Sequence, residues 1–182
     1  MKVLLLNGSP RQGNTVAALE ALKRGLIAEG INDITEIDTT NAGVSPCVAC
    51  DSCAESGECI FDDDTNEVIT EIVNADVVIF ATPVYWWGVS AQLKLVIDKM
   101  YCQNAKLQES NKKAGALVVG MAEQDDPQYE IISKQFDCIY DYLGWENKFY
   151  KSYTAGDTED LKNNSEAIAE IEKLAELFRK ES

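Results

Sequence analysis

The sequence contains no histidine at all, and this absence excludes several kinds of chemistry. Serine or cysteine nucleophiles that depend on a histidine base are ruled out, and so are metal sites with histidine ligands. We therefore expect a bound cofactor to carry any difficult reaction, while the protein supplies orientation and electrostatics.

Positive charge is scarce as well, because 16 Lys and Arg residues stand against 31 Asp and Glu residues, which gives a formal net charge of −15. A nucleic-acid partner needs a concentrated basic face, so none is expected. The acidity is typical of a soluble surface. It would also suit docking to a basic redox protein, because long-range fields steer such encounters.

Long apolar runs and targeting segments are missing too. The apolar run from Val3 to Leu6 ends at Asn7 and Gly8, which makes it too short for a signal-peptide core or a membrane span. We therefore expect a cytoplasmic protein with no membrane partner. A chain of 182 residues is expected to form one domain, residues 1–182.

The sequence does contain an alternation of short apolar segments and amphipathic segments. It predicts strands at residues 2–6, 33–38, 76–81, 115–119 and 148–153, and helices at residues 15–29, 65–74, 90–100, 128–143 and 165–179. This alternation predicts an α/β fold with a doubly wound, five-stranded parallel sheet and helices on both faces. Ligands of such folds lie beyond the carboxyl ends of the strands.

The loop after the first strand has the features of a phosphate-binding loop. It runs from Gly8 to Thr15, and its two glycines permit a tight turn and a close backbone approach. The helix that follows offers unpaired N–H groups and a positive dipole end to an anion. Ser9, Asn14 and Thr15 can add side-chain donors, and Arg11 is the only cation of the loop.

Two common nucleotide-binding loops do not match this segment. The spacing of Gly8 and Gly13 imitates a triphosphate-binding loop, but Asn14 replaces the lysine that reaches the β and γ phosphates. A dinucleotide fingerprint also fails, because its glycine spacing is absent. The loop therefore suits a monophosphate, and a glycine-rich turn without a ligand stays open as the alternative.

The loop after the third strand is rich in aromatic residues, with the order Thr82-Pro83-Val84-Tyr85-Trp86-Trp87-Gly88. A planar ring can lie against such a loop, with backbone groups at its polar edge. Alternatively, the aromatic side chains pack into the core or into a subunit interface. Because both loops belong to the carboxyl edge of one sheet, together they predict a mononucleotide site.

These loops, N-G-S-P-R-Q-G-N-T and T-P-V-Y-W-W-G-V-S-A-Q-L-K followed by V-I-D-K, resemble the NADPH-dependent FMN reductases of the flavodoxin-like superfamily. The resemblance implies a flavodoxin-like fold, a homodimer or dimer of dimers with flavins near the interface, and NAD(P)H as co-substrate. It also implies that FMN is bound by Ser9, Arg11, Gly13, Asn14, Thr15, Pro83, Val84, Tyr85, Trp86, Trp87 and Gly88. The chain departs from the pattern of this family at two places. Lys99 stands where many relatives have Arg, and the segment from Gly120 to Glu123 lacks the usual paired glycines.

Four cysteines gather in the long segment between the second strand and the second helix, with the spacing C-x2-C-x2-C-x5-C. Thiolates at this spacing suit zinc or an iron–sulfur cluster. The pattern resembles the ligand motif of iron–sulfur flavoproteins, which implies a [4Fe-4S] cluster on Cys47, Cys50, Cys53 and Cys59. Plain thiols or an oxidised pair stay open as alternatives.

Acidic residues surround these cysteines and affect both interpretations. They would lower the reduction potential of a cluster, because reduction adds negative charge. They also offer no cation to stabilise free thiolates, so the thiols are expected to be protonated without metal. We expect this loop on the flavin side of the sheet. The run Asp62–Asp64 is expected to cap the next helix and lie in solvent rather than bind metal.

Two other families of similar fold are excluded by single positions. A receiver domain needs a phosphoacceptor Asp where Thr82 and Pro83 stand. A low-molecular-weight phosphatase needs a cysteine in the first loop, and this loop contains none. The leading hypothesis is an enzyme that passes electrons from NAD(P)H through FMN to a small acceptor such as a flavin or quinone. The second is an electron carrier that passes them through the cluster to a redox protein, and the third is a flavin-binding regulatory module. No catalytic acid or base is assigned, because the cofactor carries the reaction.

Overall fold

The computed structural model describes residues 1–179 and contains the predicted five-stranded sheet. All neighbouring strands are parallel, and their order is β2-β1-β3-β4-β5. This is the flavodoxin-like order, so the predicted fold is confirmed. The strands are β1 (Val3–Asn7), β2 (Ile34–Asp38), β3 (Val77–Pro83), β4 (Lys113–Gly120) and β5 (Glu146–Thr154).

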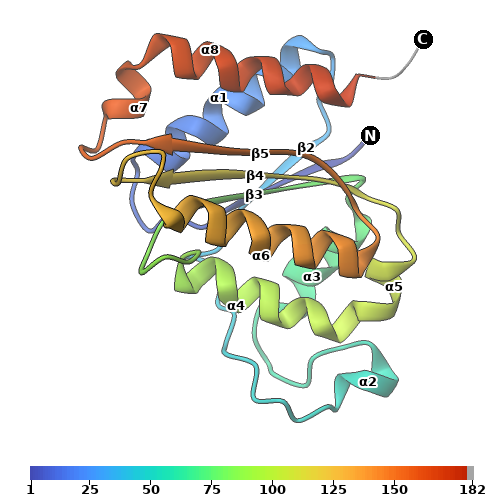
Figure 1. The fold of residues 1–182 in the computed structure, drawn as a ribbon. Helices are drawn as coiled ribbons and strands as arrows, with labels where there is room; N and C mark the ends of the chain where they lie inside the picture. Colours follow the sequence, from blue (N-terminus) through green and yellow to red (C-terminus); the bar gives the residue numbers. More distant parts are fainter. Residues whose placement is uncertain (180–182) are drawn as a thin grey trace.

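Helices cover both faces of the sheet (Figure 1). One face carries α1 (Asn14–Ala28) and α8 (Ser165–Lys173), and the other carries α3 (Thr65–Asn74), α4 (Ala91–Lys99) and α6 (Pro127–Leu143). The shorter helices are α2 (Cys53–Ser56), α5 (Asn104–Gln108), α7 (Asp160–Asn163) and the 3₁₀ helices η1 (Met100–Gln103) and η2 (Leu174–Phe178). Within residues 1–179, no helix is long and apolar enough to cross a bilayer.

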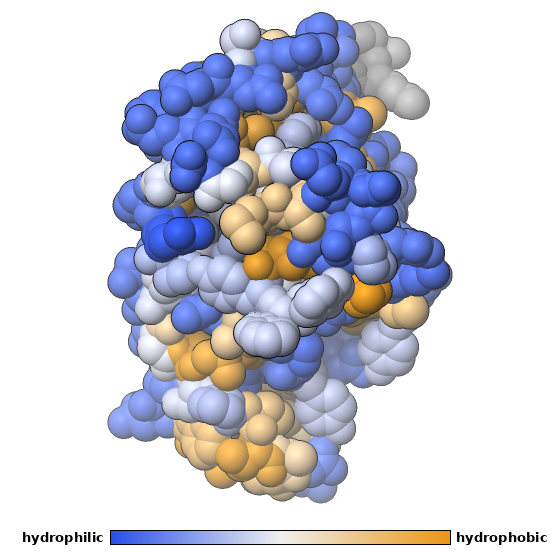
Figure 2. Space-filling view, turned by 60° about the vertical axis from the view of Figure 1, so that its left-hand side comes forward, coloured by the Kyte–Doolittle hydropathy of each residue, from blue (hydrophilic) through white to orange (hydrophobic). Residues whose placement is uncertain are grey.

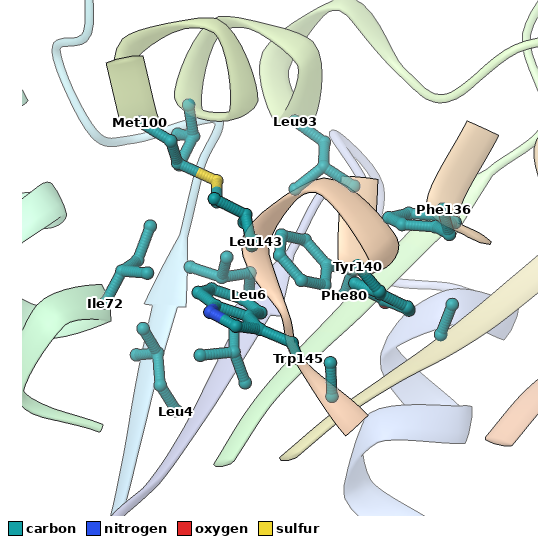
Figure 3. Packing of buried hydrophobic residues seen from close by; sticks show 14 of the residues in the cluster. Leu4, Leu6, Ile72, Phe80, Leu93, Met100, Phe136, Tyr140, Leu143 and Trp145 are labelled. Carbon is teal, nitrogen blue, oxygen red and sulfur yellow. The ribbon is translucent and has the colours of Figure 1, made fainter. Parts of the chain in front are cut away.

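Alternation along the strands divides the core into two layers. Leu4, Leu6 and Phe80 pack toward α3, α4 and α6, whereas Val3 and Leu5 pack toward α1 and α8. Every residue of β1 is buried, as expected for a central parallel strand. Figure 3 shows the first layer, in which Phe136 and Tyr140 of α6 stack on each other and lie tilted against Phe80 of β3.

The chain differs from the prediction mainly after the fifth strand. One helix is expected over residues 165–179, but α8 ends at Lys173 and continues as η2. Such 3₁₀ turns are frequent at the ends of α-helices. The approach of α8 to α1 is tight, because a Cβ on Gly25 would lie 2.1 Å from the carbonyl oxygen of Glu172. The segment predicted to be irregular, residues 41–64, contains only the short helix α2.

Candidate functional site

A pocket of about 200 Å³ lies at the carboxyl edge of the sheet, where the predicted loops meet. Its walls come from the ends of β1, β3, β4 and β5. It brings together most of the residues predicted to bind the cofactor, namely Ser9, Arg11, Gly13, Asn14, Thr15, Pro83, Val84 and Tyr85. Trp86, Trp87 and Gly88 do not line it. We call this pocket the cradle.

Sequence reasoning assigned no binding residue to two walls of the cradle, although it had noted the segment from Gly120 to Glu123. The end of β4 and the loop after β5 contribute Val119, Gly120, Met121, Ala155, Gly156 and Thr158. The signal that could have found the second wall is topological, because β5 pairs in parallel with β4 and its carboxyl end must reach the same edge. The small residues Ala155 and Gly156 directly after that strand fit a close approach to a ligand.

The start of α1 faces the cradle without a cap. Its N-cap is Gly13, which makes no side-chain hydrogen bond, and its first turn holds no acidic residue. By contrast, side chains of Ser90, Asp126 and Asn164 cap α4, α6 and α8. The first N–H groups of α1 therefore lack helical acceptors and side-chain caps, which leaves them available to an anion.

The three side chains predicted as phosphate donors, Ser9, Asn14 and Thr15, differ in what they already bind. The hydroxyl of Ser9 donates to the carbonyl of Arg11 at 2.8 Å, which closes the loop on itself. Asn14 donates to the carbonyl of Asp157 at 2.7 Å and accepts from the N–H of Leu161 at 3.0 Å, so it ties the loop to the segment after β5. The hydroxyl of Thr15 has no partner among residues 1–179, although the residue is only 3% exposed.

The aromatic residues after β3 form a two-residue hairpin. Tyr85 and Gly88 exchange two backbone hydrogen bonds of 3.0 Å, and Trp86 and Trp87 occupy the turn with φ angles of 48° and 59°. Positive φ at both turn positions is the type I′ geometry, which favours Asn and Gly and is strained for tryptophan. Trp86 is 92% exposed. The hairpin therefore holds two indoles outside the cradle rather than in its wall.

Contacts with neighbouring strands and α4 fix the base of this hairpin. The N–H of Val84 donates to the carbonyl of Val119 at 2.9 Å, and the N–H of Ser90 donates to the hydroxyl of Thr82 at 2.9 Å. A Cβ on Gly8 would lie 2.9 Å from Ala81, Ser90 and Leu93 atoms, so only glycine fits where β1 enters the cradle. Hydrogen bonds and close packing thus hold the hairpin in a fixed position beside the cradle.

A second pocket, of about 560 Å³, is lined by all four clustered cysteines. Cys47, Cys50, Cys53 and Cys59 share it with Cys102 and Lys99, and we call it the cysteine pocket. Between the cysteines, Ala49 and Asp51 adopt φ angles of 54° and 60°, which turn the backbone so that successive thiols reach one cavity. Within residues 1–179, no three Cys, Asp or Glu side chains converge as a ready metal site.

The cysteine pocket lies apart from the cradle, although its loop leaves the sheet at the carboxyl end of β2, where Thr39 bonds Asn7 at the end of β1. The two pockets share no lining residue. Ser90 caps the start of α4, next to Gly8 at the end of β1. Lys99 ends the same helix about 14 Å away, at about 1.5 Å per residue. Figure 1 shows the loop descending from the sheet edge and passing beneath α4 to α2. In Figure 2, apolar surface gathers at the bottom, in the region of this loop.

Aspartates fasten the ends of the cysteine loop. Asp63 accepts from the N–H groups of Ser45 and Thr65, each at 2.9 Å, and Asp64 accepts from the N–H of Gly43 at 2.8 Å. Although burial raises the pKa of the Asp63 carboxyl, the hydrogen bonds from Thr65 and Ser45 outweigh it and hold that pKa well below its ordinary value. The run Asp62–Asp64 thus mainly joins the two ends of the loop, and Asp64 makes no side-chain cap at α3.

The expectation that the cysteines have no cation beside them is wrong. The ammonium of Lys99 lies 3.2 Å from the sulfur of Cys59 and donates to it. The thiols also differ from one another. Hydrogen bonds from Ser52 lower the pKa of Cys50, whereas burial raises the pKa of Cys53 and raises that of Cys102 to about 11. All six cysteines are free thiols.

Comparison with known proteins agrees with this geometry. The family model for NADPH-dependent FMN reductases matches residues 1–130. An iron–sulfur flavoprotein of Methanocaldococcus jannaschii is 38% identical over 122 residues, a match that covers 66% of this chain and 62% of that protein. The match therefore spans less than two thirds of that relative's own length.

Two further similarities extend over nearly the whole chain. A Bacillus subtilis protein named as an NAD(P)H-dependent FMN-containing oxidoreductase is 27% identical, with 96% of each chain covered. The crystal structure of the azoreductase AzrA superposes with a TM-score of 0.73 at 18% identity, over 97% of this chain and 98% of that one. At that identity, the structural match establishes the shared fold.

Proposed function

The chain belongs to the NADPH-dependent FMN reductase family, and from this premise we propose that it binds FMN in the cradle and acts as an NAD(P)H-dependent oxidoreductase. Bound FMN would supply the redox chemistry, taking a hydride from NAD(P)H and passing the electrons to a small acceptor such as a flavin or a quinone. The protein's own part is to bind and orient the cofactor. A homodimer or dimer of dimers belongs to the same proposal.

The observation that carries the proposal is the uncapped start of α1. The molecule places 31 acidic residues against 16 basic ones, yet the first turn of α1 holds no acidic side chain and no capping bond. A helix start of this kind binds an anionic group through its N–H groups and dipole. Arg11 on the cradle wall adds the positive charge that a phosphate favours.

The size of the cradle suits one end of FMN rather than the whole molecule. Pockets that enclose a complete drug-sized ligand typically hold about 300–1,000 Å³, whereas the cradle holds about 200 Å³. We therefore assign the phosphate to Thr15 and the first turn of α1. The ring would lie at the mouth, against the backbone of Val84 and Tyr85, where Met121 is 79% exposed.

Extraction of the bound flavin tests this proposal. We expect FMN rather than FAD, because the cradle has one uncapped helix start and no second phosphate site among its lining residues. We also expect the loaded protein to oxidise NADH or NADPH rapidly when a quinone or free flavin is supplied. Bound FAD, or no flavin after FMN is added, would contradict the assignment. Tight FMN without turnover would indicate the regulatory module instead.

A second candidate function adds an iron–sulfur cluster to the same chain. Four thiols line one pocket, and soft thiolates in this number are the ligands of a [4Fe-4S] cluster. The absence of converged side chains does not count against the fit, because such sites rarely form before the metal binds. Cys47, Cys50, Cys53 and Cys59 would hold the cluster, and the protein would then deliver electrons to a redox partner.

Iron and sulfide analysis of anaerobically purified protein tests the second candidate. A complete cluster would give about four iron and four sulfide per chain, from the composition of the cluster itself. Replacing Cys53 by Ser should abolish both, whereas Cys138→Ser is the matched control, since that thiol is exposed on α6 outside the pocket. Iron-free wild-type protein with full NAD(P)H oxidation would leave the flavin enzyme as the whole function.

A further inference from the structure

Lys99 is an unusual charge in this molecule, because it is buried without a carboxylate partner. It ends α4, is 3% exposed, and makes no ion pair among residues 1–179. Its ammonium donates to the sulfur of Cys59 at 3.2 Å and lies 4.3 Å from the centre of the Phe61 ring. The other buried lysine, Lys112, instead donates to two backbone carbonyls.

These neighbours do not compensate a buried charge well. A thiol sulfur is a weak hydrogen-bond acceptor, and a ring face attracts a cation through its quadrupole rather than through an opposite charge. The two carboxylates on the wall of the cysteine pocket are engaged elsewhere, because Asp98 pairs with Lys94 and Asp51 accepts from Tyr101. Since buried charges need an opposite charge, the surroundings of Lys99 are suited to an anion on the side of the sulfurs.

The position of Lys99 relative to the cysteine loop is fixed by neighbouring contacts. Alternate residues of the same segment hold the loop at two more points: the hydroxyl of Tyr101 donates to Asp51 at 2.9 Å, and the amide of Gln103 donates to the carbonyl of Gly57. Three side chains from the end of α4 and η1 thus fasten the loop at residues 51, 57 and 59. The ammonium is therefore held against the thiols in advance.

We propose that Lys99 is a positioning residue for the cluster, whose ammonium offsets the negative charge of the cluster and raises its reduction potential. The inference rests on the proposed iron–sulfur site. The step concerned is the transfer of one electron to the cluster from the reduced flavin of the proposed function, which is oxidised by one electron; no bond forms or breaks, so the charge of the cluster becomes more negative by one. A hydrogen bond to a ligand sulfur and a nearby buried cation both favour that reduced state. Lys99 therefore opposes the acidic residues of the loop, which solvent screens more strongly.

Potentiometric titration of anaerobically purified full-length protein with dithionite tests this role. Lys99→Met removes the charge but keeps the length, Lys99→Arg keeps the charge, and Lys106→Met removes an exposed lysine as the control. We expect Lys99→Met to lower the equilibrium constant for cluster reduction at least tenfold, about 59 mV for a one-electron couple. Lys99→Arg and Lys106→Met should stay close to wild type.

Iron content and thermal unfolding separate the possible failures. An unchanged potential in fully loaded Lys99→Met overturns the role of Lys99 and leaves the cluster in place. Suppose that Lys99→Met, alone among the variants, loses the cluster. The role of Lys99 is supported if this metal-free variant melts at the same temperature as metal-free wild type. It is overturned if the variant melts earlier, since the lysine then merely supports the fold. Wild-type protein without iron and sulfide overturns both this inference and the cluster, while NAD(P)H oxidation reports separately on the flavin site.

Discussion

Replacing Thr15 by Val is expected to weaken the binding of FMN roughly ten- to one-hundred-fold while riboflavin binding stays nearly unchanged. The hydroxyl of Thr15 is the one polar side-chain group among Ser9, Asn14 and Thr15 that has no partner within residues 1–179. A hydrogen bond to a charged group contributes about 1.5–3 kcal/mol, and each 1.4 kcal/mol is about tenfold in Kd. Riboflavin lacks the phosphate, so it cannot lose this bond.

Thr39→Val is the matched control for this experiment. Thr39 is also 3% exposed, but its hydroxyl donates to the carbonyl of Asn7 at 3.0 Å and does not line the cradle. The control should reduce stability without separating FMN from riboflavin. Fluorescence titration of both flavins against the three proteins provides the comparison. Equal losses for both flavins in Thr15→Val would place the phosphate away from the start of α1.

Asn14 shows why the sequence predicted the cradle but not the role of each side chain in it. The strand, the two glycines and the helix start are local features, so residues 8–15 were enough to predict an anion site. The partners of Asn14, however, lie at Asp157 and Leu161, after the last strand. That contact exists only once β5 has joined β4. The side chain that looks like a phosphate donor is thereby used to join two walls of the cradle.

The cysteine loop shows the same limit in a different form. Its spacing predicts a soft-ligand site, and the run of acidic neighbours suggests that no cation is near. Lys99 lies 40 positions away from Cys59, on a helix whose own pattern gives no sign of a partner. The strand order was predictable because buried parallel strands form continuous apolar runs. The direction in which a long loop leaves the sheet has no comparable pattern, so its course beneath α4 was not foreseen.

Replacing Trp86 by Asn together with Trp87 by Gly is expected to stabilise the protein and to impair its function at the same time. Both tryptophans occupy positive φ, at 48° and 59°, and each such residue costs about 1–2 kcal/mol. Asn and Gly are the residues that a type I′ turn favours. Allowing for the greater freedom of glycine in the unfolded chain, about 0.5–1 kcal/mol, we expect a net gain of about 2 kcal/mol. For a chain of this length, that raises Tm by roughly 4–8 °C.

The loss of function follows from what the strained hairpin presents. A backbone that holds two indoles outward at a cost in stability is typical of a functional site. Trp86 and Trp87 follow directly after Tyr85, which lines the cradle and closes the turn with Gly88, so the indoles lie beside the mouth of the cradle. Trp86→Ala with Trp87→Ala is the control, because it removes the rings while non-glycine residues keep the strained turn. Both double variants should bind FMN more weakly or shift the oligomeric state in sedimentation, but only the Asn-Gly variant should melt later. If FMN affinity and sedimentation both stay at wild-type values, the rings serve neither the flavin nor a subunit interface.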